Sequence, residues 1–123
     1  METIILDNLD TEEIFKEYIP SNADLADMCQ FFSVFTDVTR MKMLAALSIC
    51  ELCVSDLAYL LKFNQTTVSH QLKILRDAGM VATRRDGKII YYRVTCPHIN
   101  EVMLTGATYL CDVHKKKFSE DFS

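Results

Sequence analysis

The apolar residues of this chain change their spacing at Gly79, and this change constrains the fold more than any other feature. From Val54 to Ala78 they recur every three or four positions around a break at Lys62-Phe63-Asn64, which predicts a short helix, a tight turn and a longer helix. Beyond Gly79, apolar and polar residues alternate on either side of Asp86-Gly87, a pair typical of a type I′-like hairpin turn. The sequence therefore predicts a mainly α fold with one small β-hairpin.

The size and composition of the chain favour a single domain. Its 123 residues are 50% apolar and 24% charged, which is typical of one compact core. Three glycines, two prolines and no repeat leave no stretch that resembles a linker. We expect residues 1–123 to form one domain, with the helix pair at about 54–78, the hairpin at about 80–95 and a last helix at about 98–115.

The apolar runs and the cysteines indicate a cytoplasmic protein. The longest apolar runs have about five residues, whereas a membrane span needs about twenty, so no membrane is expected as a partner. The first residues lack the basic and apolar regions of a secretory signal. The five cysteines are odd in number and irregularly spaced, which favours free thiols over a disulfide scaffold.

The charges are distributed unevenly along the chain. The net charge is −4, and residues 1–61 hold eleven acidic but only three basic residues. Residues 62–93 reverse this balance, with seven basic and two acidic residues. Because binding to a polyanion depends on the charges at the contact, this basic segment is compatible with nucleic acid despite the acidic total.

Further helices are predicted on both sides of the helix pair. Asp10 to Glu13 has the acidic residues of a first helical turn, and Pro20-Ser21-Asn22 ends that helix and caps the next. Helical spacing continues from Leu25 to Phe35 and again after Thr36-Asp37.

The last predicted helix carries an apolar stripe that needs a covering partner. Small residues in the middle of the stripe would allow a second helix to approach closely, and a second copy of the chain is the expected partner in so small a protein. This predicts a homodimer, and a two-fold symmetric dimer would bind a palindromic site if its partner is nucleic acid. The stripe consists of Val102, Met103, Gly106, Ala107, Leu110, Cys111 and His114.

The longer helix of the pair has one apolar and one polar face, which predicts a helix-turn-helix that binds double-stranded DNA. Val68, Leu72 and Leu75 fall on one side, and hydroxyl, imidazole and ammonium groups fall on the other. Basic residues of the hairpin would form a wing against the DNA backbone or the minor groove. The expected DNA-binding residues are Gln65, Thr66, Thr67, Ser69, His70, Lys73, Arg84, Arg85 and Lys88.

Four stretches of the sequence carry a family resemblance. They are residues 35–44 (FTDVTRMKML), 51–58 (ELCVSDLA), 65–81 (QTTVSHQLKILRDAGMV) and 86–94 (DGKIIYYRV). Together they resemble the ArsR/SmtB family of winged-helix repressors, over roughly residues 25–115. The resemblance implies a homodimeric, mainly bacterial and cytoplasmic repressor that leaves its operator when an effector binds, often a thiophilic or divalent metal ion.

The first candidate sensor is a pair of cysteines, Cys50 and Cys53. Family members that sense arsenite, cadmium or lead resemble this chain around Cys53 but carry a second cysteine where Ser55 stands here. A soft three-coordinate site needs converging thiolates, so Cys53 would have to recruit Cys50 or Cys29. The alternative is structural, with Cys50 as a small core residue and Cys53 as a weak helix cap.

The resemblance implies a second candidate sensor. In other family members this site links the end of the wing to the last helix of the partner subunit. Cys96 and His98 match one half of that site, whereas the other half becomes Tyr109 and Asp112. Zinc would therefore find Cys96, His98 and Asp112 but no fourth protein ligand.

Cys111 and His114 lie two residues away from the register of this second site. Three roles are open for these two residues: packing in the dimer seam, metal binding and thiol redox chemistry.

Several function classes follow from these patterns. The leading prediction is a repressor released by Zn, Cd, Pb or As(III), with no metal required for DNA binding. A repressor of the same fold that senses thiol redox state or reactive sulfur is the alternative, and a winged-helix protein-interaction module is more remote. A Cys50-x-x-Cys53 oxidoreductase is disfavoured because the chain lacks the βαβ pattern that such motifs follow, so we expect no enzyme.

Overall fold

The computed structural model describes the backbone of residues 9–121 and the side chains of residues 11–115. The chain groups into two compact units, Met1–Val34 and Phe35–Ser123. Whether residues 1–123 behave as a single domain stays a prediction. Along the described residues no helix is long and apolar enough to cross a membrane.

The first unit contains two helices, α1 (Leu9–Tyr18) and α2 (Asn22–Ser33). The Ser21 hydroxyl accepts a hydrogen bond from the backbone N–H of Asp24 at 3.2 Å, which confirms the predicted N-cap of α2. A single 3-10 turn, Val34–Thr36, follows α2.

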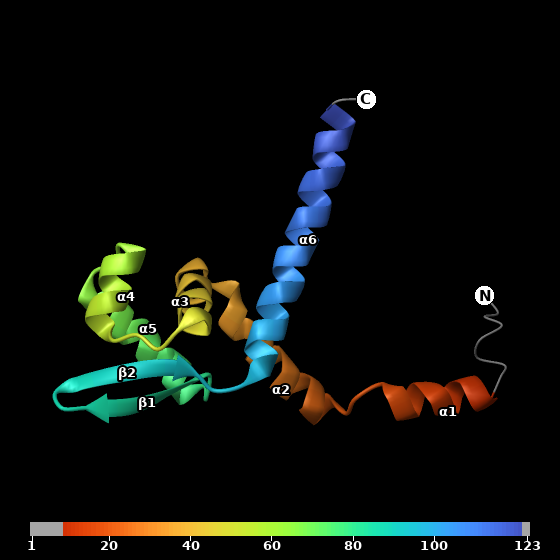
Figure 1. Cartoon of the computed structure of the whole chain (residues 1–123). Helices are drawn as coiled ribbons and strands as arrows, with labels where there is room; N and C mark the ends of the chain where they lie inside the picture. Colours follow the sequence, from red (N-terminus) through yellow and green to blue (C-terminus); the bar gives the residue numbers. More distant parts are fainter. Residues whose placement is uncertain (1–8, 122–123) are drawn as a thin grey trace. The chain divides into compact units, whose positions relative to one another are not determined.

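The second unit holds the helix pair and the hairpin (Figure 1). The helix α3 contacts α4, α5, α6 and β2, so it is the element around which this unit packs. The side chains with the least exposure come from α3, α4, α5 and the start of α6, and they are Met43, Leu44, Leu57, Val68, Leu72, Leu75 and Ile99. The elements of this unit are α3 (Val38–Ile49), α4 (Val54–Leu61), α5 (Gln65–Asp77), β1 (Val81–Asp86), β2 (Ile89–Val94) and α6 (Pro97–Asp121).

The hairpin differs from the prediction in its turn. Asp86 pairs with Ile89 as the last rung of the antiparallel ladder, so the two turn residues are Gly87 and Lys88 rather than Asp86 and Gly87. Gly87 has φ +63°, and Lys88 keeps a negative φ. A type I′ turn needs positive φ at both central residues, so the predicted type I′-like geometry is wrong and the pattern is that of a type II′ turn.

A third segment extends the hairpin at its base. Leu52 forms an isolated antiparallel bridge with Tyr92, with N···O distances of 3.2 Å and 2.9 Å in the two directions. The loop between α3 and α4 is therefore attached to β2 by backbone hydrogen bonds. No apolar periodicity marks a single bridge of this kind, and the sequence did not predict it.

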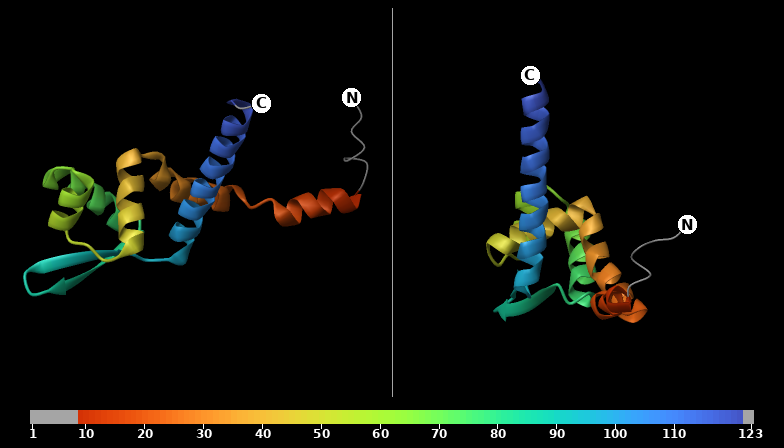
Figure 2. Two further views of the ribbon diagram at one scale, coloured as in Figure 1. Left: turned by 45° about the horizontal axis from the view of Figure 1, so that its top comes forward. Right: turned by 90° about the vertical axis from the view of Figure 1, so that its right-hand side faces the viewer.

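The helix α6 begins at Pro97 and extends to Asp121, beyond the end expected near residue 115. Ile99 anchors its start in the core with 0% exposure. Farther along, α6 leaves the other elements of the second unit (Figures 1 and 2), and Leu104, Tyr109 and Leu110 are 68%, 65% and 52% exposed. Among the side chains that the structure describes, α6 therefore carries exposed apolar residues from Leu104 to Leu110 that no other element of its unit covers.

Candidate nucleic-acid interface and sensor residues

The turn between α4 and α5 sets the start of the candidate recognition helix. Lys62 ends α4 in the left-handed region with φ 59°, which turns the chain sharply. Two residues later the Asn64 side-chain oxygen accepts a hydrogen bond from the backbone N–H of Thr67 at 2.7 Å. This cap fixes the first turn of α5.

The two faces of α5 separate as its periodicity predicts. Val68, Leu72 and Leu75 are at most 1% exposed. Thr67 is half-buried, because it lies at the edge of the apolar face. The side chains open to solvent on the other face are Gln65, Thr66, Ser69, His70 and Lys73.

One further cation on α5 belongs with this surface. Arg76 lies in the last turn of the helix and is exposed. It was not among the predicted DNA-binding residues, although it is part of the basic segment 62–93, and that segment was the signal for it.

The wing divides its basic residues between two environments. Arg85 and Lys88 are exposed. Arg84 is also exposed, but it donates from Nε to both carboxylate oxygens of Glu51, at 2.8 Å and 3.0 Å. The Arg84 guanidinium also lies over the ring of Tyr91, 4.6 Å from its centre.

The hydrogen bond to Glu51, opposed by a small loss of hydration, raises the pKa of Arg84 above its ordinary value. Arg84 therefore has a carboxylate partner, which the sequence did not predict. Successive side chains of a strand point to opposite faces, so the neighbouring Arg85 is not drawn into this cluster.

The two cysteines of the first candidate sensor flank Glu51 and Leu52. Cys53 is the N-cap residue of α4, but its side chain makes no cap hydrogen bond, and it is half-buried. Cys50 is exposed, so its alternative interpretation as a small core residue is wrong for the described chain. It follows α3 in an extended conformation and lies outside the packed faces of the helices.

In the second candidate sensor, Asp112 lies far from Cys96 and His98 within one chain. Cys96 is half-buried just before α6, and His98 is exposed with Nδ1 3.5 Å from Glu101 Oε2. Asp112 follows His98 by fourteen residues on the same helix, about 21 Å along its axis at the rise of an α-helix. His98 and Asp112 of one chain therefore cannot share an ion, and a shared site requires a second copy.

Among the described residues, no cluster of three or more His, Cys, Asp or Glu side chains is placed to hold a metal ion. In this part of one chain, neither candidate sensor therefore has three ligands in place. Cys111 and His114 are both exposed on α6.

A family model and individual relatives of this chain indicate the same protein family. The family model described as "Bacterial regulatory protein, arsR family" matches residues 37–83. The chain is 40% identical over 83 residues to the transcriptional repressor SmtB homolog of Synechocystis sp., an alignment that covers 68% of this chain but only 63% of that protein. It is 33% identical over 90 residues to the cadmium resistance transcriptional regulatory protein CadC of Listeria innocua, covering 72% and 76% of the two chains.

A solved structure supports the same relationship. The AntR antimony-specific transcriptional repressor superposes with a TM-score of 0.73 at 28% identity, over 79% of this chain and 88% of that one. The predicted winged-helix fold is confirmed. These relatives are regulators of transcription rather than enzymes, which confirms the expectation of a non-enzyme.

Proposed function

Because this chain belongs to the arsR family of bacterial regulatory proteins, we propose that it is a sequence-specific DNA-binding transcriptional repressor. The observation that carries the proposal is the two-sided α5, whose apolar face is buried in the core while its polar face is open to solvent beside a basic wing. A helix of this kind fits the major groove, where its side chains can reach base edges.

The DNA contacts divide between base edges and phosphates. Gln65, Thr66, Ser69 and His70 have the donors and acceptors that base edges require, and Thr67 lies at the edge of this set. The phosphate contacts would come from Lys73, Arg85 and Lys88, joined by Arg76. Arg84 contributes less than these cations, because Glu51 balances its charge.

We further propose that the repressor is a homodimer on a palindromic operator in the bacterial cytoplasm. The apolar stripe of α6 is exposed from Gly106 onward, whereas Val102 and Met103 are half-buried. The exposed part is the surface that a second copy would cover. Two-fold symmetry then places two copies of α5 against two half-sites about one DNA turn, or a multiple of it, apart.

The effector we propose is a thiophilic or divalent metal ion, Zn, Cd, Pb or As(III), and DNA binding itself needs none. The relatives are named for cadmium resistance and for antimony. The residues that would hold the ion are Cys50 and Cys53, whose thiolates suit soft ions. Their loop is hydrogen-bonded to the wing through Leu52 and Tyr92, so an ion there would act directly on an element of the DNA interface.

The second candidate sensor is an alternative site for the same effector. Cys96 and His98 of one subunit with Asp112 of the other supply three donors suited to zinc, but Tyr109 stands where a further ligand is expected. A thiol-redox or reactive-sulfur response at Cys50 and Cys53 is the alternative, since both are free thiols and Cys50 is exposed.

The test is binding of the full chain to duplex DNA from its own promoter, measured by fluorescence anisotropy and repeated with Zn(II), Cd(II), As(III) and polysulfide. The proposal expects salt-dependent binding to promoter DNA, tighter than to a scrambled duplex, and release by at least one metal. Release by polysulfide alone would indicate that the repressor responds to reactive sulfur through its thiols and not to a metal ion. Failure to bind any duplex would favour a protein-interaction module.

A further inference from the structure

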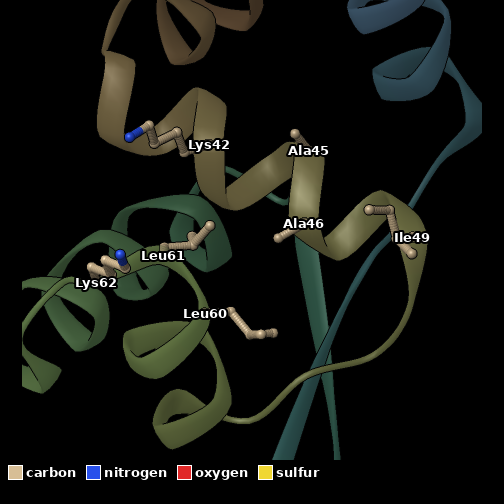
Figure 3. A pocket seen from close by; sticks show the side chains of 7 residues that line it. All are labelled: Lys42, Ala45, Ala46, Ile49, Leu60, Leu61 and Lys62. Atoms are coloured by element: carbon tan, nitrogen blue, oxygen red, sulfur yellow. The ribbon is translucent and has the colours of Figure 1, made fainter.

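A groove lies between α3 and the C-terminal half of α4, and Figure 3 shows the side chains that line it. Its volume of about 590 Å³ is within the range of small-molecule sites in proteins. The walls are aliphatic, and two of their members, Ile49 and Leu60, are 85% and 58% exposed. The lining residues are Lys42, Ala45, Ala46, Ile49, Leu60, Leu61 and Lys62.

The groove is polar at one end only. Figure 3 shows the ammonium groups of Lys42 and Lys62 on the same side, while Ile49 lies at the opposite side. No acidic residue is among the seven that line the groove. An occupant that matches this lining has an anionic head and an apolar tail.

The backbone at Lys62 has a conformation that is unusual for a residue with a side chain. Lys62 has φ 59°, the left-handed region that glycine adopts without steric cost and that L side chains rarely adopt. It is the single non-glycine residue with positive φ in the described part of the chain. A lysine at this position adds an ammonium group to the lining of the groove, although glycine would serve the turn equally well.

The second ammonium group is directed to the same turn. Lys42 Nζ lies 5.7 Å from the centre of the Phe63 ring, within the distance of a cation–π contact. Lys42 on α3 and Lys62 directly after α4 therefore converge on the segment that joins α4 to α5.

We propose that this groove binds a small amphiphilic carboxylate, an aliphatic chain with one anionic head, with the head between Lys42 and Lys62 and the tail against Ala45, Ala46 and Ile49. An occupant there would contact both α3 and the turn that precedes the candidate recognition helix. Its effect on DNA rests on the proposed function, whereas its binding does not.

The experiment is isothermal titration calorimetry of the full chain with decanoate, below its micelle-forming concentration, with decanol as the neutral control. Saturable decanoate binding is expected. Decanol should bind at least about tenfold more weakly, because hydrogen bonds to charged groups contribute about that much to affinity. Equal affinity for both compounds, or no saturable binding of decanoate, would overturn the proposal.

Two variants locate the site. K62G removes the ammonium group and keeps a residue suited to positive φ, so decanoate affinity should fall about tenfold while the melting temperature is unchanged or higher. A45L fills the groove on an exposed face of α3 with another good helix former, and it should also weaken binding. The matched control K16A removes an exposed lysine that does not line the groove and should bind decanoate as the parent does.

Unchanged decanoate affinity in both K62G and A45L would overturn the proposal. If K42Q and K62G lose salt-dependent DNA binding but keep decanoate affinity, the two lysines are phosphate contacts and the proposal is wrong. Decanoate binding by a chain that binds no duplex DNA would reject the proposed repressor function and leave the groove site standing, so the two failures are distinguishable.

Discussion

Arg84 Nε lies 2.8 Å from Glu51 Oε2, so a basic residue of the wing is paired with the loop that carries Cys50 and Cys53. The backbone bridge between Leu52 and Tyr92 joins the same two segments. A change in the loop therefore has a direct structural connection to the wing, without passing through the core.

This pairing predicts unequal roles for adjacent arginines. Replacing Arg85 with alanine should reduce the slope of log K against log salt by about one unit, the effect of losing one phosphate contact. Replacing Arg84 should change the slope less, because its charge is balanced by Glu51 in the free protein. Anisotropy titrations across a salt series provide the measurement, and a larger slope change for Arg84→Ala would contradict this assignment.

The cap of α5 makes a testable contribution to stability. Asn64→Ala removes the acceptor 2.7 Å from the Thr67 N–H and should lower the free energy of unfolding by about 1 kcal/mol. Asn64→Asp keeps an acceptor and serves as the control. Urea denaturation followed by circular dichroism measures both, and equal stability of Asn64→Ala and the parent would show that the cap contributes nothing.

Much of this helix was predictable from sequence because its signals are local. The cap at Asn64, the apolar face and the end before Gly79 all depend on residues within a few positions of one another. The Glu51–Arg84 pair joins residues 33 positions apart, and no local pattern reports such a contact.

The hairpin turn was displaced by one residue for a related reason. Alternation of apolar and polar side chains identifies the two strands but leaves open which residue forms the last ladder pair. The structure resolves this with Asp86 opposite Ile89. A complete ligand set was the hardest feature to predict. The set implied for Cys96 and His98 includes residues on α6 of another copy, which no local pattern in one chain can place.

Assembly through α6 is tested at Gly106. A Cβ atom built there meets nothing within 4 Å, so Gly106→Glu should fold as a single chain while placing a carboxylate where two helices would approach. We expect a monomer in sedimentation equilibrium and weaker binding to a palindromic duplex, with Gly106→Ala remaining a dimer. A Gly106→Glu protein that stays dimeric would place the seam elsewhere.

The ranking of the two sensors is tested with paired variants. A Cys50→Ser/Cys53→Ser protein should bind promoter DNA normally and no longer leave it when Cd(II) or As(III) is added, because two thiolates are lost. Cys96→Ser/His98→Ala should keep the response. The reverse pattern, measured by metal titration of the preformed complex, would make the site between the wing and α6 the sensor.

The account depends most on the exposed face of α5 being the DNA-binding surface. Lys73 projects from this face and is exposed, so its replacement should not disturb the core. The most direct measurement is the salt dependence of binding to promoter DNA for the parent and for Lys73→Ala. We expect Lys73→Ala to bind more weakly and to reduce the slope of log K against log salt by about one unit. Equal affinity and equal slope for the two proteins would contradict the assignment of α5 as the recognition helix.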